Sequence, residues 1–230
     1  MAEAGGGEGE GEGCCLSAMV ESGEEGGGVE SHRYYLARRT LLEMLADRRY
    51  DVSPIPGGAA QTLAEFRAWW LDKPDLDRLS FSAALLSNPS QKVRVIFCGT
   101  DPVKVSTIRE IYKGLKNESS TRLILVVQSK MTFKSREAIK DIFSSKVEIF
   151  QITDLLVNIT KHFLIPKHEV LTQEEKNELL KKYSVEDKQL PRMLETDAIA
   201  RYYGLEKGTV MKVTYDGELT GSHVTYRCIM

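Results

Sequence analysis

Apolar side chains at helical spacing define the first ordered segment of the chain. One set of them falls at i, i+4, i+7 and i+8 on a single helical face, with Ser31 as the predicted N-cap. We expect this helix to end near Arg49. The apolar set consists of Ala37, Leu41, Met44 and Leu45.

Strand and helix patterns alternate after a Pro- and Gly-rich break at residues 54–58. The predicted strands cover 79–86, 93–97 and 123–127, and the predicted helices cover 63–70, 105–115 and 138–143. The continuous apolar run at 123–127 is typical of a strand that is buried on both faces. This order predicts a first domain of the α/β class.

A second unit is expected to open with Val147–Phe150, a short alternating strand that follows a change of character at 144–146. Thr172 and Glu175 have the spacing of a capping box, in which side chain and backbone satisfy each other reciprocally. A helix should therefore run from 173 to about 183. We expect it to bury Leu179, Leu180 and Tyr183.

The end of the chain predicts a short helix and a hairpin. The helix should run from about Thr196 to Tyr203 and stop at Gly204, because a left-handed C-terminal cap favours a residue without Cβ. Two antiparallel strands, over 209–215 and 223–229, should close the unit.

Composition divides the 230 residues into three parts. Residues 1–30 hold ten Gly and eight Glu with few apolar residues, which predicts a disordered acidic tail. The first domain is then assigned to 31–146 and the second to 147–230. Each is long enough to bury a core without a metal or disulfides.

The formal net charge of −2 conceals an uneven distribution. Residues 31–146 carry twenty Lys and Arg against twelve Asp and Glu, a surplus of +8, whereas 147–230 carry eleven against thirteen. A basic surplus of this size can support contact with a phosphate backbone, and it is equally compatible with a solvated Lys-rich surface.

Cysteine and histidine usage indicates a reduced intracellular compartment and no metal site. Two of the four cysteines, Cys14 and Cys15, are adjacent in the Gly/Glu tail, and no CxxC or HExxH pattern occurs. No N-terminal signal pattern or apolar run of membrane-spanning length is present. We therefore expect no metal, no cofactor and no membrane.

The patterns of catalytic sites are incomplete in this chain. Glu174-Glu175-Lys176 has the E-x-K spacing of metal-dependent nucleases, but it falls in the first turn of a predicted helix, where acids favour the positive end of the helix dipole. Gly99–Pro102 lacks the Lys-Ser/Thr ending of a phosphate loop, and no G-x-S-x-G elbow occurs. The sequence predicts no catalytic residues.

Several separated motifs carry a resemblance to a known family. They are VNITKH at 157–162, PKH at 166–168, QLPR at 189–192 and RYYG at 201–204. Their order resembles the C-terminal assembly domain of the fifth subunit of eukaryotic nuclear RNA polymerases, a domain that has an archaeal counterpart. The stretch 38–50 is similar to the opening helix of the same family.

The resemblance implies a restriction-endonuclease-like α/β jaw domain without catalytic residues, followed by a small two-layer α/β assembly domain. It implies a noncatalytic polymerase subunit in the nucleus that is not a homo-oligomer. Its partners would be the largest subunit and other polymerase subunits, with downstream duplex DNA contacted through the jaw. No particular DNA-contacting residue can be named.

Departures from the family pattern favour a divergent plant paralogue of the RNA polymerase V type. The family run D-P-V-A-R-Y is Asp197–Tyr202 here and lacks its proline, and the run S-E-T-A-G-R-Y has become 217–223 without its Arg and Tyr. Such a paralogue would act in RNA-directed DNA methylation and gene silencing. The alternatives are the subunit shared by RNA polymerases I, II and III, a free DNA-binding or adaptor protein, and a residual nuclease.

A polymerase-subunit interface is predicted where a rigid proline adjoins cations and aromatic side chains. The predicted interface residues are Gln189, Leu190, Pro191, Arg192, Arg201, Tyr202 and Tyr203. The alternative is that Tyr202 or Tyr203 lies in the core, which we expect for at least one of them. Replacing Arg192 and Arg201 with Ala should weaken assembly and leave the isolated fold largely intact.

Overall fold

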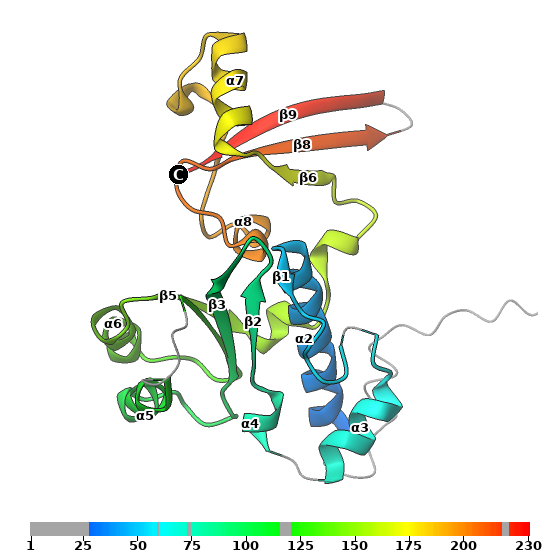
Figure 1. The fold of residues 1–230 in the computed structure, drawn as a ribbon, viewed down its shortest axis with the longest axis vertical. Helices are drawn as coiled ribbons and strands as arrows, with labels where there is room; N and C mark the ends of the chain where they lie inside the picture. The colour runs from blue at the N-terminus through cyan, green and yellow to red at the C-terminus, as the bar shows by residue number, and fades with distance from the viewer. Residues whose placement is uncertain (1–27, 59, 73–74, 116–120, 218–220) are drawn as a thin grey trace, which may run out of the picture.

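Two sheets, one above the other in Figure 1, organise the chain. The computed structural model describes residues 28–58, 60–72, 75–115, 121–217 and 221–230. The acidic tail predicted for 1–30 therefore lies almost wholly outside the described residues. None of the described helices has the length and apolar character needed to cross a membrane.

The first sheet has five strands in the order β1-β2-β3-β4-β5. The strands β1 to β3 pair antiparallel, whereas β3, β4 and β5 pair parallel. Their bounds are β1 Tyr50–Asp51, β2 Phe81–Leu85, β3 Asn88–Phe97, β4 Arg122–Val127 and β5 Lys146–Gln151. The run 123–127 is fully buried, which confirms the predicted two-faced strand.

Helices cover both faces of this sheet. The helix α2 (Gly28–Asp47) packs on one face with α3 (Leu63–Asp72), and the short α4 (Leu76–Leu79) lies beside β3. The helices α5 (Val105–Leu115) and α6 (Phe133–Ile142) cover the other face, as Figure 1 shows. Alternate residues of β4 point into the two cores.

The start of α2 differs from the prediction. The helix already includes Gly28, so Ser31 lies in its first turn and is fully buried instead of acting as the N-cap. The predicted end of the helix near Arg49 is close to the observed one. The helix stops at Asp47, and Arg49 adopts a positive φ of 65°.

The strand that was expected to open the second unit belongs to the first sheet. Residues 146–151 pair in parallel with β4 from Arg122↔Lys146 to Val127↔Gln151. The segment at 144–145 is thus the connection from α6 into an edge strand, not a domain boundary. The prediction was wrong here because an alternating pattern indicates a half-buried strand but does not show which sheet that strand joins.

The second sheet has the order β6-β8-β9-β7 and follows two short 3₁₀ helices, Ile152–Leu155 and Ile159–Lys161. Its strands are β6 Lys167–Val170, β7 Arg192–Met193, β8 Val210–Gly217 and β9 Gly221–Ile229. The hairpin of β8 and β9 confirms the predicted pair of strands. A third 3₁₀ helix, Asp187–Gln189, precedes β7.

The helix α7 (Gln173–Tyr183) packs on one face of this sheet, and α8 (Ala198–Tyr203) packs on the other. The Thr172–Glu175 capping box and the left-handed cap at Gly204 are both present, as predicted. Tyr183, however, is 55% exposed, whereas Lys176 is buried with its Nζ 2.6 Å from Asp187 Oδ2. The prediction of a buried Tyr183 was therefore wrong.

Candidate functional site

The seven predicted interface residues fall into two separate groups. Residues 189–192 leave the third 3₁₀ helix and enter β7 at an edge of the second sheet. Residues 201–203 lie on α8, which faces the first sheet from below the second (Figure 1). The two groups therefore have different surroundings.

The first group has an anchored backbone and, apart from Leu190, exposed side chains. Gln189 closes a reciprocal cap with Glu186, whose amide donates to Gln189 Oε1 at 2.7 Å. Pro191 O accepts from Cys228 N at 2.8 Å, which anchors the loop to β9. Leu190 packs partly against the core around Leu179, whereas Gln189, Pro191 and Arg192 are exposed. This group forms a rigid, accessible edge.

Tyr202 belongs to the interior and not to an external surface. Its side chain is 4% exposed, and its hydroxyl donates to Asp47 Oδ2 at 2.7 Å. Burial, followed by the Asp47 hydrogen bond, raises the pKa of Tyr202. The prediction that one of the two tyrosines is core is confirmed for Tyr202, whereas its placement on a docking surface is corrected. Tyr203 is half-buried beside it.

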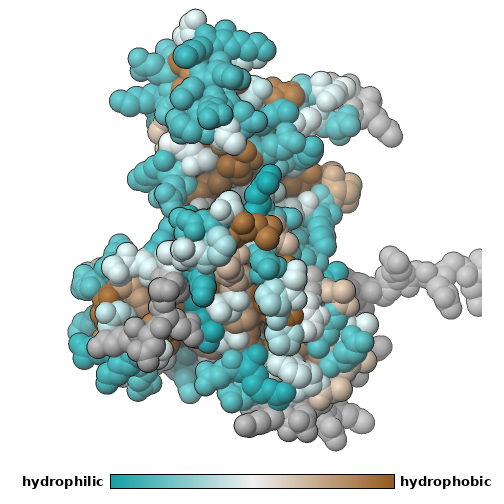
Figure 2. Space-filling model, viewed as in Figure 1, coloured by the Kyte–Doolittle hydropathy of each residue, from teal (hydrophilic) through white to brown (hydrophobic). Residues whose placement is uncertain are grey.

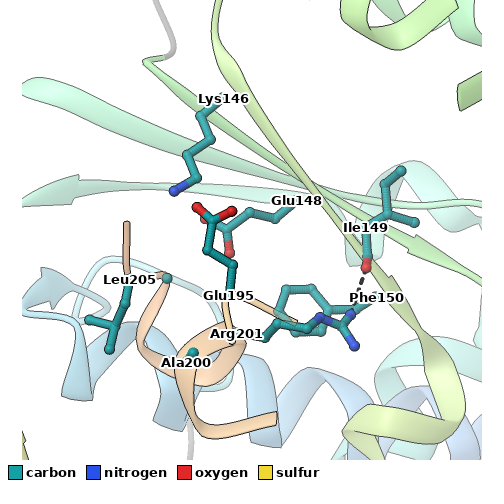
Figure 3. A pocket seen from close by; sticks show the side chains of 9 residues that line it. Lys146, Glu148, Ile149, Phe150, Glu195, Ala200, Arg201 and Leu205 are labelled. Carbon is teal, nitrogen blue, oxygen red and sulfur yellow. Dashed lines mark hydrogen bonds between the residues drawn. The ribbon is translucent and has the colours of Figure 1, made fainter. Parts of the chain in front are cut away.

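Arg201 binds within its own chain. Its guanidinium donates to Ile149 O at 2.8 Å, lies 4.7 Å from the ring centroid of Phe150 and is 3.3 Å from Asp154 Oδ2. Figure 3 shows the side chain of Arg201 running beside the ring of Phe150 to the carbonyl of Ile149 on β5. Arg201 therefore ties α8 to the last strand of the first sheet.

Arg48 is the centre of the contact between the two sheets. Its Nε and Nη2 each donate at 2.7 Å to carbonyls in the last turn of α8, those of Tyr202 and Arg201. Its Nη1 and Nη2 also hold both carboxylate oxygens of Glu148, at 3.2 and 2.8 Å. The side chain of Arg48 is 3% exposed. One cation thus caps a helix of the second unit and pairs with a strand of the first.

A second arginine extends this contact toward solvent. Arg122 of β4 donates to Glu148 Oε1, to Gly204 O at 3.3 Å and to Glu206 Oε1 at 3.1 Å. Lys146 also reaches Glu206, and its hydrogen bond and charge hold the pKa of that carboxyl below its ordinary value. We call Arg48, Arg122, Glu148, Arg201 and Tyr202 the interdomain seam.

The VNIT motif supports the same seam from the other side. Asn158 caps the second 3₁₀ helix through Thr160 N, and its Nδ2 donates to Glu43 Oε2 at 2.8 Å and to the Tyr202 hydroxyl at 3.2 Å. Burial opposes ionisation of Glu43, but hydrogen bonds from Asn158 and Lys161 lower its pKa overall. The motif therefore has a structural role in joining α2 to α8.

Two small cavities lie beside Arg201 at the seam. One of about 220 Å³ lies between β5 and α8 and is the cavity drawn in Figure 3. The other, of about 240 Å³, is lined by Met44, Leu155, Val157 and Tyr202 among others. Arg201 lines both. Within the described residues, no three His, Cys, Asp or Glu side chains gather in a way that could hold a metal ion.

Two family matches account for most of the chain. RNA polymerase Rpb5, N-terminal domain, matches residues 28–115, and RNA polymerase Rpb5, C-terminal domain, matches residues 157–229. The chain belongs to the RNA polymerase Rpb5 family. The first match covers the first unit as far as α5, and the second match covers the second unit. The strands β4 and β5 of the first sheet lie in the segment between the two matched ranges.

Similar Rpb5-family proteins cover nearly the full length of the chain. The DNA-directed RNA polymerase V subunit 5A of Arabidopsis thaliana is 54% identical over 216 residues, which is 94% of either chain. The DNA-directed RNA polymerases IV and V subunit 5B of the same plant is 54% identical over 202 residues, 87% of this chain and 91% of that protein. The DNA-directed RNA polymerases I, II, and III subunit RPABC1 of Caenorhabditis elegans is 34% identical over 208 residues. These residues are 88% of this chain and 98% of that protein.

Sequence reasoning missed the centre of the seam in this Rpb5-family chain. In the sequence, Arg48 is marked only by its place in the stretch that resembles the opening helix of the family. Glu148 is marked only as part of a predicted strand. No local signal links them, because they are 100 residues apart. The position of Glu148 between the apolar residues Val147 and Ile149 was the available hint of a buried partner.

We expect Arg201 and Arg192 to differ in their effect on the isolated chain. Arg201→Ala removes a cation–π contact and a hydrogen bond, so the free energy of unfolding should fall by about 1–2 kcal/mol. Arg192→Ala, on an exposed side chain, should change it by less than about 0.5 kcal/mol. Urea denaturation of both variants measures this. Equal losses would contradict the distinct placements of the two arginines.

Proposed function

We propose that this chain is a noncatalytic subunit of a nuclear DNA-directed RNA polymerase, of the RNA polymerase V type. The observation that carries the proposal is the 54% identity to RNA polymerase V subunit 5A, which extends over 94% of both chains. A likeness of this length includes both units and the segment between them. The subunit would act in RNA-directed DNA methylation and gene silencing.

The alternative of a subunit shared by RNA polymerases I, II and III is less well supported. The relatives that carry that description are 34–35% identical, against 54% for the plant subunits 5A and 5B. The RNA polymerase V subunit 5C of Arabidopsis thaliana is 44% identical over 229 residues. The identities favour the plant-specific group.

The second unit is proposed to hold the largest subunit through the edge at residues 189–194. Gln189, Pro191 and Arg192 are exposed there on an anchored backbone, and Leu194 is 64% exposed beside them. A rigid apolar and cationic edge suits an interface, because little side-chain and backbone freedom is lost on binding. Arg201 and Tyr202 contribute indirectly, since they fix the second unit against the first.

The first unit is proposed to contact downstream duplex DNA by charge. The surplus of +8 over residues 31–146 includes exposed cations on the two helices that cover one face of the sheet. These cations are Arg109 and Lys113 on α5, and Lys134, Arg136 and Lys140 on α6. Contacts of this kind release counterions and weaken steeply with salt, and they read no base sequence.

A noncatalytic role is proposed because the residues of the rejected nuclease pattern have structural roles. Glu175 closes the capping box with Thr172, and Lys176 is held by Asp187 and Gly208 O. The strands β3 and β4 contain no carboxylate. Phosphodiester chemistry is therefore assigned to the partner subunits.

Arg192→Ala in the full chain tests this proposal. Tagged wild-type protein should retain the largest subunit through a high-salt wash, whereas Arg192→Ala should lower retention about tenfold at the same salt, as loss of an interface arginine does. Lys188→Ala, three residues from Pro191 and also exposed, serves as the matched control. Undiminished retention by Arg192→Ala would contradict the assignment of this edge.

A further inference from the structure

The outer edge of β9 is unpaired over most of its length. The strand β9 pairs with β8 from Gly221 to Cys228, but on its other side β7 pairs only with Cys228 and Ile229. Figure 1 shows the hairpin of β8 and β9 extending beyond the rest of the second unit, with β9 outermost, and Figure 2 gives the same view with side chains filled in. Within the part of the chain that the structure describes, no strand covers the edge at 221–227.

Successive residues of β9 direct their backbone N–H and C=O groups alternately to the two sides of the strand. This alternation identifies which of these groups have no strand of the described chain to pair with. Cys228 N points to the β7 side, where it donates to Pro191 O at 2.8 Å, and Ile229 N points to the β8 side, where it donates to Thr209 O. Residues two apart on a strand point the same way, so Ser222, Val224 and Tyr226 direct their N–H and C=O groups to the open edge. These form a regular row in line with the Cys228 bond.

This edge lacks the usual protection against strand addition. Natural edges are kept from pairing by charges, proline, bulges or short length. The other edge strand, β6, has four residues, includes Lys167 and Glu169, and follows Pro166. In contrast, residues 221–226 contain no Lys, Arg, Asp, Glu or Pro, and the register with β8 has no bulge.

Exposed apolar side chains lie next to the same edge. Val224 is 43% exposed, and Tyr183 at the end of α7 is 55% exposed with its ring centroid 6.5 Å from that of Tyr226. A strand laid against β9 would bring every second side chain onto this Tyr183, Val224 and Tyr226 surface. The exposed ring of Tyr183 thus adds apolar surface directly beside this edge.

We propose that an extended segment of another polymerase subunit adds to the second sheet as a fifth strand along Ser222, Val224 and Tyr226. It would carry apolar or aromatic residues at the alternate positions that face Tyr183 and Tyr226. The bound strand would continue the line of β7, directly beside the exposed edge at 189–192. The inference rests on the proposed function, since it takes the partner from the polymerase.

The chemistry of the edge selects this occupant over two others. Open backbone donors and acceptors in a row are satisfied by an extended polypeptide, and not by nucleic acid. The chain's own residues 1–27 suit a strand poorly, since Gly and Glu dominate them, and α2 begins at the end of the first unit remote from the hairpin (Figure 1). A second copy of the chain is an outcome that the test distinguishes.

Hydrogen exchange at single-amide resolution tests the proposal on the full chain, free and within the affinity-purified polymerase. The amides of Ser222, Val224 and Tyr226 should exchange rapidly in the free chain and at least about 100-fold more slowly in the assembly, as hydrogen-bonded sheet amides do. The amides of His223 and Thr225, bonded to β8, should be protected in both states. Fast exchange of the first three in an intact polymerase would overturn the added strand and leave the proposed function standing.

Two further outcomes concern the choice of partner. Purification of the chain without any polymerase subunit would contradict the proposed function and the assigned partner together. Protection of Ser222, Val224 and Tyr226 in the free chain, with a dimer mass by light scattering, would show that a second copy pairs with the edge and would overturn the proposal.

Val224→Pro tests the same edge by substitution. Proline removes an N–H that points away from β8, a position where edge strands tolerate it, so the free chain should keep its melting temperature. Retention of polymerase subunits after a salt wash should fall about tenfold, as expected when an interface backbone hydrogen bond and its neighbours are lost. Val224→Ile keeps both the N–H and an apolar β-branched side chain, so it should retain polymerase subunits far better than Val224→Pro. Wild-type retention of a folded Val224→Pro chain would contradict the proposal, and should that variant fail to fold, the exchange experiment decides.

Discussion

Arg48→Ala should lower the free energy of unfolding by about 3–5 kcal/mol, the largest loss we expect from any single change at the interdomain seam. The substitution leaves the carboxylate of Glu148 with Arg122 as its remaining partner at 3.4 Å. It also removes the side-chain donor to the Tyr202 carbonyl, and it leaves the Arg201 carbonyl with the Gly204 amide at 3.0 Å. Buried acceptors that lose a charged donor carry their full desolvation cost. Urea denaturation measures the change.

The neighbouring arginine provides the control. The side chain of Arg49 is exposed, so Arg49→Ala should cost less than about 0.5 kcal/mol. A double-mutant cycle with Glu148→Ala should show coupling between positions 48 and 148, because Arg48 holds both carboxylate oxygens. Additive effects, or a loss below about 1 kcal/mol for Arg48→Ala, would contradict the central place given to this cation.

Gly204→Ala should destabilise the chain by about 2–4 kcal/mol through strain and loss of hydrogen bonds. Gly204 caps α8 with φ of 63°, a conformation that L side chains rarely adopt. An added Cβ would also lie 2.9 Å from Nη1 of both Arg48 and Arg122. These guanidinium groups cannot retreat without releasing Glu148. Thermal and urea denaturation measure the loss.

Gly114 offers a matched glycine in the same chain. It lies on the exposed side of α5, and an added Cβ there would meet no atom within 4 Å. Gly114→Ala should therefore raise stability by about 0.5–1 kcal/mol, because alanine is the better helix former. If both substitutions had the same effect, the strain and the close approach at Gly204 would not be the cause.

Local sequence signals predicted those elements whose causes are themselves local. The capping box of Thr172 and Glu175, the glycine stop at 204 and the hairpin of β8 and β9 all depend on residues within a few positions of each other. The buried run at 123–127 was equally readable, because only a strand between two helical layers is apolar on both faces.

The errors arose where distant residues decide the outcome. The strand β5 was assigned to the wrong unit because its pairing with β4 leaves no mark on its own sequence. Tyr183 has helical spacing for the core, but α7 ends beside the open edge of β9, where its ring is left largely exposed. Arg201 and Tyr202 were predicted to lie at an interface because a cation beside an aromatic ring is common there. The same two side chains can equally form contacts inside the chain, as they do here.

The split between residues 189–192 and 201–203 changes how substitutions in this family member should be interpreted. A change at Arg201 or Tyr202 acts on the stability of the joined units, whereas a change at Arg192 acts on an accessible edge. Loss of polymerase association is therefore evidence for a direct contact only when the free chain keeps its stability. Comparison of Arg192→Ala with Arg201→Ala separates the two causes.

The most direct measurement is mass spectrometry of the complex that the tagged full-length chain retains after a high-salt wash. We expect a polymerase largest subunit in one-to-one ratio with the chain, and we expect this largest subunit to be of the RNA polymerase V type. Recovery of the chain as a monomer, with no polymerase subunit bound, would contradict it.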